Sequence, residues 1–120
     1  MFFNLECAAC VSRGIPFLKQ QAREYGDRLI LLLIHTAFGH RHYAQDKVVP
    51  TLQHFAGSFA KLSFPIALDN DGKLAESWGV EGTPHWFVFN NGEQVRSIYG
   101  SQANAQTRLE YLLLEMFNPP

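Results

Sequence analysis

Apolar residues that recur every three or four positions predict four helices along the chain. The first spans residues 11–25, ends at Gly26 and includes Pro16. Because proline has no backbone N–H to donate to the preceding turn, we expect a kink or a break near residues 12–16. The apolar stripe of this helix consists of Val11, Ile15, Leu18, Ala22 and Tyr25.

The other three helices are predicted from shorter patterns. Pro50 favours the first position of a helix, where its missing N–H is not needed, so a second helix is expected over residues 50–59. A short helix is expected over residues 74–78, with Gly79 at its C-terminal end. A final amphipathic helix runs through residues 109–116.

Short apolar or alternating segments predict the strands of one sheet. Residues 29–34 are apolar at every position, which is typical of a strand buried on both faces of a parallel sheet, so we expect this strand to be central. Residues 35–47 are polar and irregular. Residues 90–93 form a tight turn that makes the last two strands a β-hairpin. The other predicted strands are residues 2–5, 64–68, 85–89 and 94–99.

This order of elements predicts an α/β layer sandwich with a mixed sheet. Crossover helices join parallel strands, whereas the two strands of a hairpin are antiparallel. The 120 residues are 47% hydrophobic, which is enough for one packed core, and chains usually spend about 100–200 residues on a domain. We therefore expect residues 1–120 to form a single domain.

The charge and the apolar runs of the chain exclude several classes of partner. Ten Lys and Arg residues against eleven Asp and Glu leave a formal charge of −1, so neither nucleic acid nor a membrane surface is an expected partner. Residues 29–34 form the longest apolar run, far short of the roughly 20 residues of a membrane span. The first six residues do not resemble a signal peptide. As written, the chain is expected to be cytoplasmic, or exported or membrane-anchored if a further segment precedes it.

The two cysteines form the pattern Cys7-Ala8-Ala9-Cys10. A disulfide that closes so short a loop removes little entropy from the unfolded chain, so stabilisation is a weak explanation. Structural zinc normally has four ligands, and no second pair with ligand spacing follows. Two thiols at the start of a helix, after a short strand in an α/β chain, are typical of redox chemistry. Backbone amides at the helix start favour a thiolate at Cys7, which makes Cys7 the expected nucleophile and Cys10 the resolving thiol.

The chain resembles the thioredoxin superfamily, and within it most closely the TlpA-like thiol-disulfide oxidoreductases. The resemblance is carried by the cysteine motif and by Gly79-Val80-Glu81-Gly82-Thr83-Pro84 ahead of an apolar strand. It implies a three-layer thioredoxin-like fold, with a central mixed β-sheet flanked by helices. It also implies that Pro84 is a cis-proline facing the cysteines, and that Thr83 presents its backbone to a bound substrate.

The resemblance also implies the partners of the protein. They would be protein or small-molecule thiols and disulfides, together with a reductase or another redox partner. No cofactor is expected beyond a redox-active Cys7–Cys10 disulfide, and no metal. The implied role lies in cell redox homeostasis or antioxidant defence.

Three departures from the family concern the surroundings of the thiols. Glu6 stands where the family usually has Trp, and its negative charge should oppose thiolate formation. Ala9 replaces a common Pro. Met1 occupies the position of the buried acid of thioredoxin.

Histidines are the remaining candidates for a chemical role. His85 follows Pro84 and is a possible modulator of the thiols. The other four histidines are expected in loops and on helix surfaces, without a metal site: His35, His40, His42 and His54. Trp78, Trp86 and the ten Phe are expected in the core, although Phe3, Phe38 and Trp86 could also form a rim that holds substrate.

Two other function classes remain open. A peroxiredoxin-like thiol peroxidase would share much of the fold, but that family has Thr where this chain has Asn4. A Sco-type copper metallochaperone uses two cysteines and a distal histidine, for which Cys7, Cys10 and His85 are the candidates. In that family the cysteines are typically one residue further apart.

Overall fold

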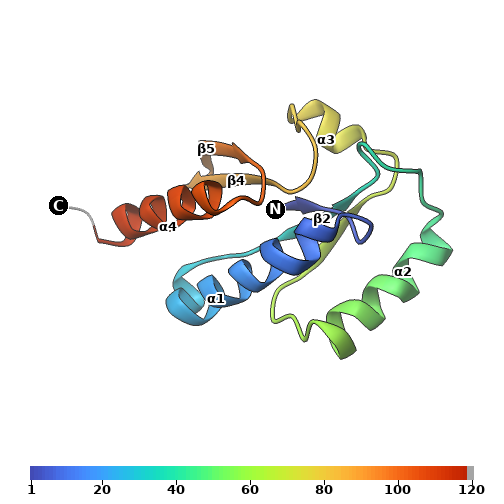
Figure 1. Cartoon of the computed structure of the whole chain (residues 1–120), viewed down its shortest axis with the longest axis horizontal. Coiled ribbons are helices and arrows are strands. Elements are labelled where there is room, and N and C mark those ends of the chain that lie inside the picture. Colours follow the sequence, from blue (N-terminus) through green and yellow to red (C-terminus); the bar gives the residue numbers. More distant parts are fainter. Residues whose placement is uncertain (119–120) are drawn as a thin grey trace.

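The computed structural model describes residues 1–118, in which a mixed five-stranded sheet lies between helices (Figure 1). The sheet order is β3-β2-β1-β4-β5. β1 is parallel to β2 and antiparallel to β4, β2 and β3 are parallel, and β4 and β5 form the expected antiparallel hairpin. The predicted α/β class is confirmed. The strands are β1 (Phe2–Phe3), β2 (Leu33–Thr36), β3 (Ile66–Asp69), β4 (His85–Asn90) and β5 (Glu93–Tyr99).

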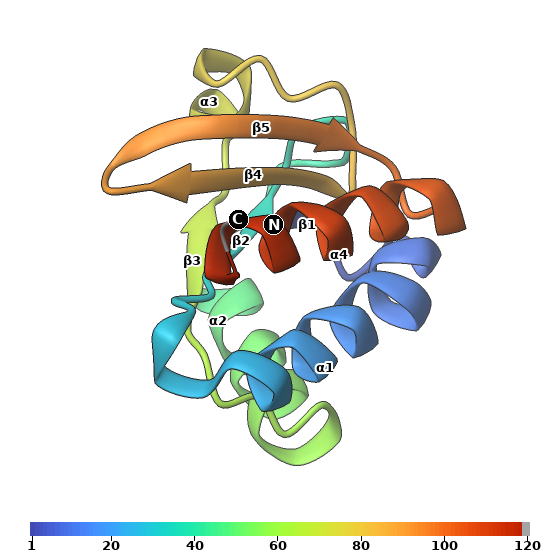
Figure 2. The ribbon, with the colours of Figure 1, turned by 90° about the vertical axis from the view of Figure 1, so that its left-hand side faces the viewer.

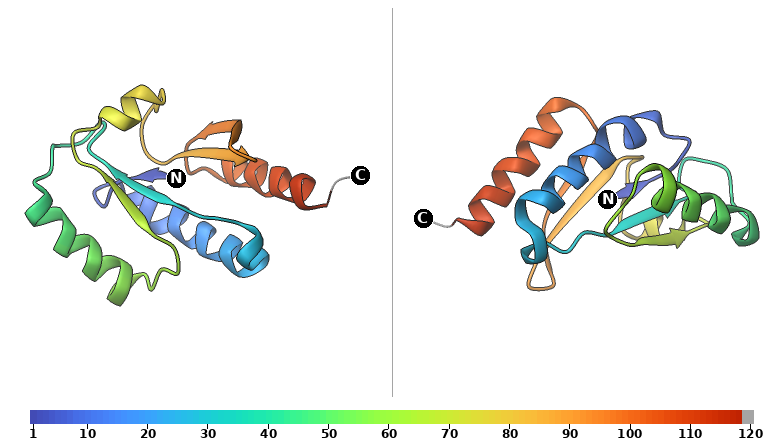
Figure 3. Two further views of the ribbon diagram at one scale, coloured as in Figure 1. Left: turned by 180° about the vertical axis from the view of Figure 1, so that it is seen from behind. Right: turned by 90° about the horizontal axis from the view of Figure 1, so that it is seen from below.

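The helices form the two outer layers. α1, α2 and α4 cover one face of the sheet and α3 lies on the other (Figure 2). On the three-helix face, α2 lies beside the β3 edge and α4 beside the hairpin, with α1 between them (Figure 3). The helical segments are η1 (Cys10–Gly14), α1 (Ile15–Tyr25), η2 (Gly26–Arg28), α2 (Gln45–His54), η3 (Phe55–Phe59), α3 (Lys73–Ser77) and α4 (Ala103–Phe117).

The core is divided between the two faces of the sheet, because successive strand residues point to opposite sides. Phe3 and Leu33 point into the larger cluster, with Cys10, Leu52 and Trp86 from the surrounding elements. The smaller cluster under α3 contains Phe2, Ile34, Ala75 and Val80. The cysteine helix therefore packs on the face with the larger core.

The predicted strand over residues 29–34 is wrong in its position. β2 begins only at Leu33 and continues through His35 and Thr36. Residues 29–32 pair with no strand, because the first residues of the neighbouring strands, Phe2 of β1 and Ile66 of β3, lie opposite Ile34 and Leu33. Ile30 is accordingly 93% exposed. The central strand of the sheet is β1, with β2 next to it.

Two helix predictions meet different outcomes. The helix does not break near residues 12–16: η1 is π-helical and continues directly into α1, which begins at Ile15 with Pro16 in its first turn. The expected start of the second helix at Pro50 is wrong, because α2 begins at Gln45 and has Pro50 inside it. A helix can keep an internal proline at the loss of one backbone hydrogen bond, so a proline pattern alone does not fix its first residue.

Not every aromatic residue is buried as expected. Trp78 is 39% exposed and packs with Phe2 and Phe87 over the α3 face of the sheet. Phe59 and Phe89 are also exposed. The expectation that Trp78 and every Phe belong to the core is therefore wrong.

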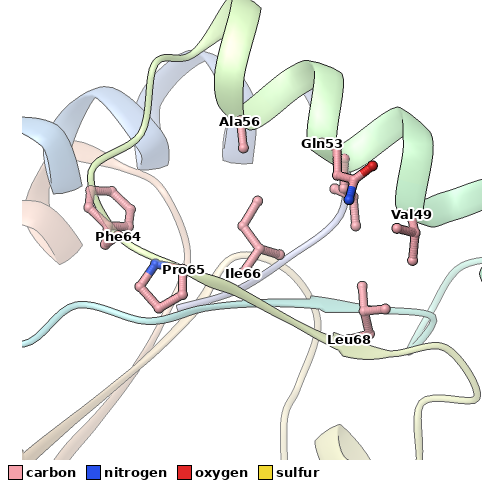
Figure 4. Close-up of a pocket in the computed structure, with 8 residues that line it drawn as sticks. Val49, Gln53, Ala56, Phe64, Pro65, Ile66 and Leu68 are labelled. Atoms are coloured by element: carbon pink, nitrogen blue, oxygen red, sulfur yellow. The ribbon is translucent and has the colours of Figure 1, made fainter.

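An apolar groove of about 300 Å³ lies between α2 and the edge strand β3 (Figure 4). Val49 and Ala56 of α2 and η3 face Ile66 and Leu68 across it. Within residues 1–118, no helix combines the length and apolar character needed to span a membrane.

Candidate active site

A disulfide joins Cys7 and Cys10 at the start of the first helical segment. Their Cα atoms are 5.3 Å apart, and the Cys10 N–H donates a hydrogen bond to Cys7 Sγ over 3.2 Å. Cys7 is half-buried, whereas Cys10 is fully buried in the larger core. An attacking group can therefore reach the sulfur of Cys7 and not that of Cys10.

The loop that carries Cys7 forms one wall of the site, and the loop before β4 forms the second wall. The Thr83–Pro84 peptide bond is cis, and the Thr83 carbonyl oxygen lies 3.5 Å from Cys7 Sγ. Seventy-six positions separate these residues in the sequence. β1 brings them together, because it precedes the cysteines and pairs with β4 through Phe2 and His85.

Asn4 fixes the loop that carries Cys7. Its side-chain amide donates to the Thr36 carbonyl over 2.7 Å, its Oδ1 accepts from the Glu6 N–H over 2.8 Å, and the Tyr43 hydroxyl oxygen lies 3.1 Å from the same Oδ1. Asn4 is completely buried. A polar residue at the end of an apolar strand is the only sequence signal for this role.

The Glu6 carboxylate is paired with two groups of the loop between β2 and α2. Tyr43 donates to it over 2.5 Å and Arg41 lies 3.0 Å from it. The hydrogen bond from Tyr43, and then the charge of Arg41, lower the pKa of Glu6. Burial and the hydrogen bond to Glu6 raise the pKa of Tyr43. Glu6 is thus an ionised carboxylate whose charge, expected to oppose the thiolate, is partly offset by Arg41.

His40 contacts the second wall of the site, a role that the sequence pattern did not reveal. Its Nε2 lies 3.1 Å from Thr83 Oγ1. The same β2–α2 loop therefore holds both walls, Glu6 through Tyr43 and Arg41, and Thr83 through His40. His42 and His54 are exposed, as expected.

If the cysteine pair exchanges disulfides with a substrate, replacing His40 by Ala is expected to raise KM for that disulfide about fivefold, with kcat changed less than about twofold. The reason is that Thr83 loses the hydrogen bond that holds its side chain. Steady-state disulfide exchange measures both constants. His42→Ala removes an exposed histidine from the same loop and should leave both unchanged. Equal effects of the two substitutions would show that the His40–Thr83 contact has no part in positioning the loop.

His85 is engaged on both ring nitrogens. The Glu81 N–H donates to Nδ1 over 3.1 Å, so the proton of the neutral ring is on Nε2, which donates to Ser97 Oγ over 2.6 Å. Burial lowers the pKa of His85. Its ring stacks on Phe87, on the face of the sheet opposite to the cysteine helix. The predicted modulation of the thiols by His85 stays a prediction, without a direct contact to support it.

His35 is buried in β2, so its expected place in a loop or on a helix surface is wrong. It is 1% exposed, and the Leu5 N–H donates to its Nε2 over 3.3 Å. Phe3 and Tyr43 pack edge-on against the ring. Burial, with a smaller contribution from the charge of His40, lowers the pKa of His35 to about 4, while Glu6 acts in the opposite sense.

His35 should make the protein less stable in mild acid. Its pKa falls from 6.5 in the unfolded chain to about 4 in the fold, so between these values the unfolded chain binds more protons. The free energy of unfolding therefore decreases as the pH falls through this window, by up to about 3 kcal/mol. Urea unfolding between pH 7 and pH 4 measures it. His35→Gln keeps an acceptor for Leu5 but does not titrate, so its free energy of unfolding should depend less steeply on pH. If wild type and this variant show the same dependence on pH, His35 is not the group responsible.

The predicted aromatic rim is only partly present. Phe3 and Trp86 are buried, and the Trp86 indole N–H donates to the Gly100 carbonyl over 2.7 Å. Neither residue is accessible to a substrate, which corrects that expectation, whereas Phe38 is half-buried. Among residues 1–118, no three His, Cys, Asp or Glu side chains are grouped to hold a metal ion.

Comparisons with known proteins establish the architecture. No protein-family model and no curated protein matches the sequence. Among solved structures, the chain is similar to a thioredoxin-like protein whose solution structure was determined in the oxidized form. The TM-score is 0.73, with 21% identity, over 95% of this chain and 75% of that chain. The predicted three-layer arrangement is thus a thioredoxin-like fold.

Proposed function

We propose that the protein is a thiol-disulfide oxidoreductase with a TlpA-like site. The observation that carries the proposal is the half-buried Cys7 sulfur, joined to buried Cys10 and 3.5 Å from the Thr83 carbonyl of the cis-proline loop. The site needs no cofactor beyond this disulfide. Its substrates are protein or small-molecule thiols and disulfides, and a second redox partner restores the starting state.

The proposed exchange has two balanced steps. In the reducing direction, the Cys7 thiolate attacks one sulfur of a substrate disulfide, forms a mixed disulfide and releases the other sulfur as a thiolate. The Cys10 thiolate then attacks Cys7 Sγ, which forms the Cys7–Cys10 disulfide and releases the second substrate thiolate. The Cys10 N–H, 3.2 Å from Cys7 Sγ, stabilises negative charge on that sulfur. In the oxidising direction the same steps run in reverse.

The Thr83 carbonyl supplies a binding group for the substrate. It accepts a backbone N–H from a peptide whose cysteine is bonded to Cys7, because it faces the reactive sulfur. Pro84 fixes the direction of this carbonyl. His40 and Glu6 act as positioning residues, through Thr83 and through the cysteine loop.

The function is tested by equilibrating the protein with graded mixtures of reduced and oxidised glutathione. Alkylation followed by mass measurement counts the free thiols. Reversible exchange of two thiols supports the proposal. A reduction potential near roughly −270 mV would indicate a reductant of disulfides, and one near roughly −120 mV an oxidant of thiols. If no intramolecular disulfide forms in any mixture, the proposal is wrong. Stoichiometric binding of Cu(I) or Cys7-dependent turnover of hydrogen peroxide would then favour the alternatives.

A further inference from the structure

A polar cavity of about 370 Å³ adjoins the disulfide site. It lies between the loop that carries Thr83 and Pro84, the end of β5 and the start of α4. A backbone hydrogen bond from the Gly100 N–H to the Pro84 carbonyl, over 2.9 Å, ties the first two of these walls together. The cavity is therefore directly connected to the cis-proline loop.

The cavity and the reactive sulfur share one wall. Thr83 lines the cavity, and its carbonyl oxygen is 3.5 Å from Cys7 Sγ. A substrate bonded to Cys7 and hydrogen-bonded to Thr83 would have the groups next to its own sulfur at this shared wall. The lining of the cavity can thus discriminate among substrates.

The lining carries a single formal charge, the guanidinium of Arg108 in α4. The rest of it is uncharged and includes the polar groups of Tyr99, Gln102 and Asn104. Within the described part of the chain, the one ion pair is that of Arg41 with Glu6, so no carboxylate there is paired with Arg108. Arg108 is exposed at this cavity and has no acidic partner, so its guanidinium is available to an anionic group of a bound substrate, and carboxylates suit its planar geometry.

We propose that this cavity is a substrate subsite that recognises a carboxylate close to the disulfide being exchanged. The preferred substrates are acidic thiols and disulfides, either small molecules or peptides with an acidic residue beside the cysteine. The inference rests on the proposed function and adds the substrate class to it. Arg108 is the specificity-determining residue. Tyr99 also lines the cavity, and its hydroxyl lies against Gly82, where an added side chain would meet it.

The test compares disulfides that differ only in charge. The reduced full-length protein is mixed with dithiodipropionate, hydroxyethyl disulfide or cystamine, which are anionic, neutral and cationic. A second series uses peptide disulfides with Glu, Gln or Lys beside the cysteine. For each disulfide, the rate of wild type is divided by the rate of Arg108→Gln, so that the intrinsic reactivity of the disulfide cancels.

The expected ratio is about five for the anionic members and about one for the neutral ones, and it should decrease with added salt. Arg96→Gln, which removes an exposed arginine of β5 outside the cavity, is the matched control and should leave every rate unchanged. An effect confined to the small disulfides assigns the subsite to an acidic small thiol, and one confined to the peptides assigns it to an acidic peptide.

Two outcomes would overturn the inference in distinguishable ways. If Arg108→Gln lowers the exchange rate equally for all disulfides, or for none, the protein exchanges disulfides without discriminating by their charge. Only the proposed subsite is then wrong. If wild type exchanges with none of the disulfides, the proposed function itself fails.

Discussion

Replacing Cys7 by Ser is expected to lower the rate of disulfide exchange more than about a thousandfold, because a serine hydroxyl does not form the thiolate nucleophile. Cys7 is the half-buried member of the pair and the one beside the Thr83 carbonyl. The measurement is the exchange rate with hydroxyethyl disulfide. This disulfide is uncharged, so its exchange rate should not depend on Arg108. The fold should be retained, because the substitution replaces one small side chain by another.

Cys10→Ser is the matched control for this prediction. Cys10 is buried, so its loss should leave the first attack intact and block the second. The mixed disulfide between Cys7 and the substrate then accumulates and is detected by its mass. If Cys10→Ser abolishes the first attack while Cys7→Ser preserves it, the two roles are reversed.

Replacing Asp69 by Ala is expected to lower the free energy of unfolding by about 4 kcal/mol. The carboxylate is buried at the end of β3 and accepts three hydrogen bonds. The Thr36 hydroxyl donates over 2.7 Å, and the N–H groups of Leu74 and Ala75 each donate over 3.0 Å. All three donors would lose their acceptor, and α3 would lose its link to β2 and β3.

Urea unfolding at pH 7 measures the loss of unfolding free energy. The midpoint should move to a lower urea concentration, while the dependence of the free energy on urea concentration stays unchanged. Asp27→Ala is the control, because Asp27 is exposed in η2, and it should cost less than about 0.5 kcal/mol. A loss below about 1 kcal/mol for Asp69→Ala would mean that water replaces the carboxylate, and that this network contributes little to the stability of the fold.

The parts of the fold that could be predicted from the sequence are those set by local patterns. The cysteine motif, the irregular helix before Pro16 and the hairpin each depend on neighbouring residues, and all three are present. The start of β2 could not be predicted, because the apolar run over residues 29–34 does not show which of its residues have a strand beside them. That depends on the lengths of β1 and β3, which are far away in the sequence.

The parts of the site that could not be predicted are long-range contacts of polar residues. His40 and Tyr43 lie in a loop without periodicity, and their partners Thr83 and Asn4 are 43 and 39 positions away. The prediction for His35 is wrong because a polar residue after an apolar run is usually the end of a strand. Here β2 continues past it, and the Leu5 N–H satisfies one ring nitrogen in the interior.

The shortness of β1 has a consequence for the motions of the molecule. Only two residues, Phe2 and Phe3, join the β2–β3 half of the sheet to the β4–β5 half. Amide hydrogen exchange at this seam should therefore be faster than in the β4–β5 hairpin, because few hydrogen bonds need to break for the halves to part. Cys7 follows β1 and Thr83 precedes β4, so an opening between β1 and β4 would move the two walls of the site apart.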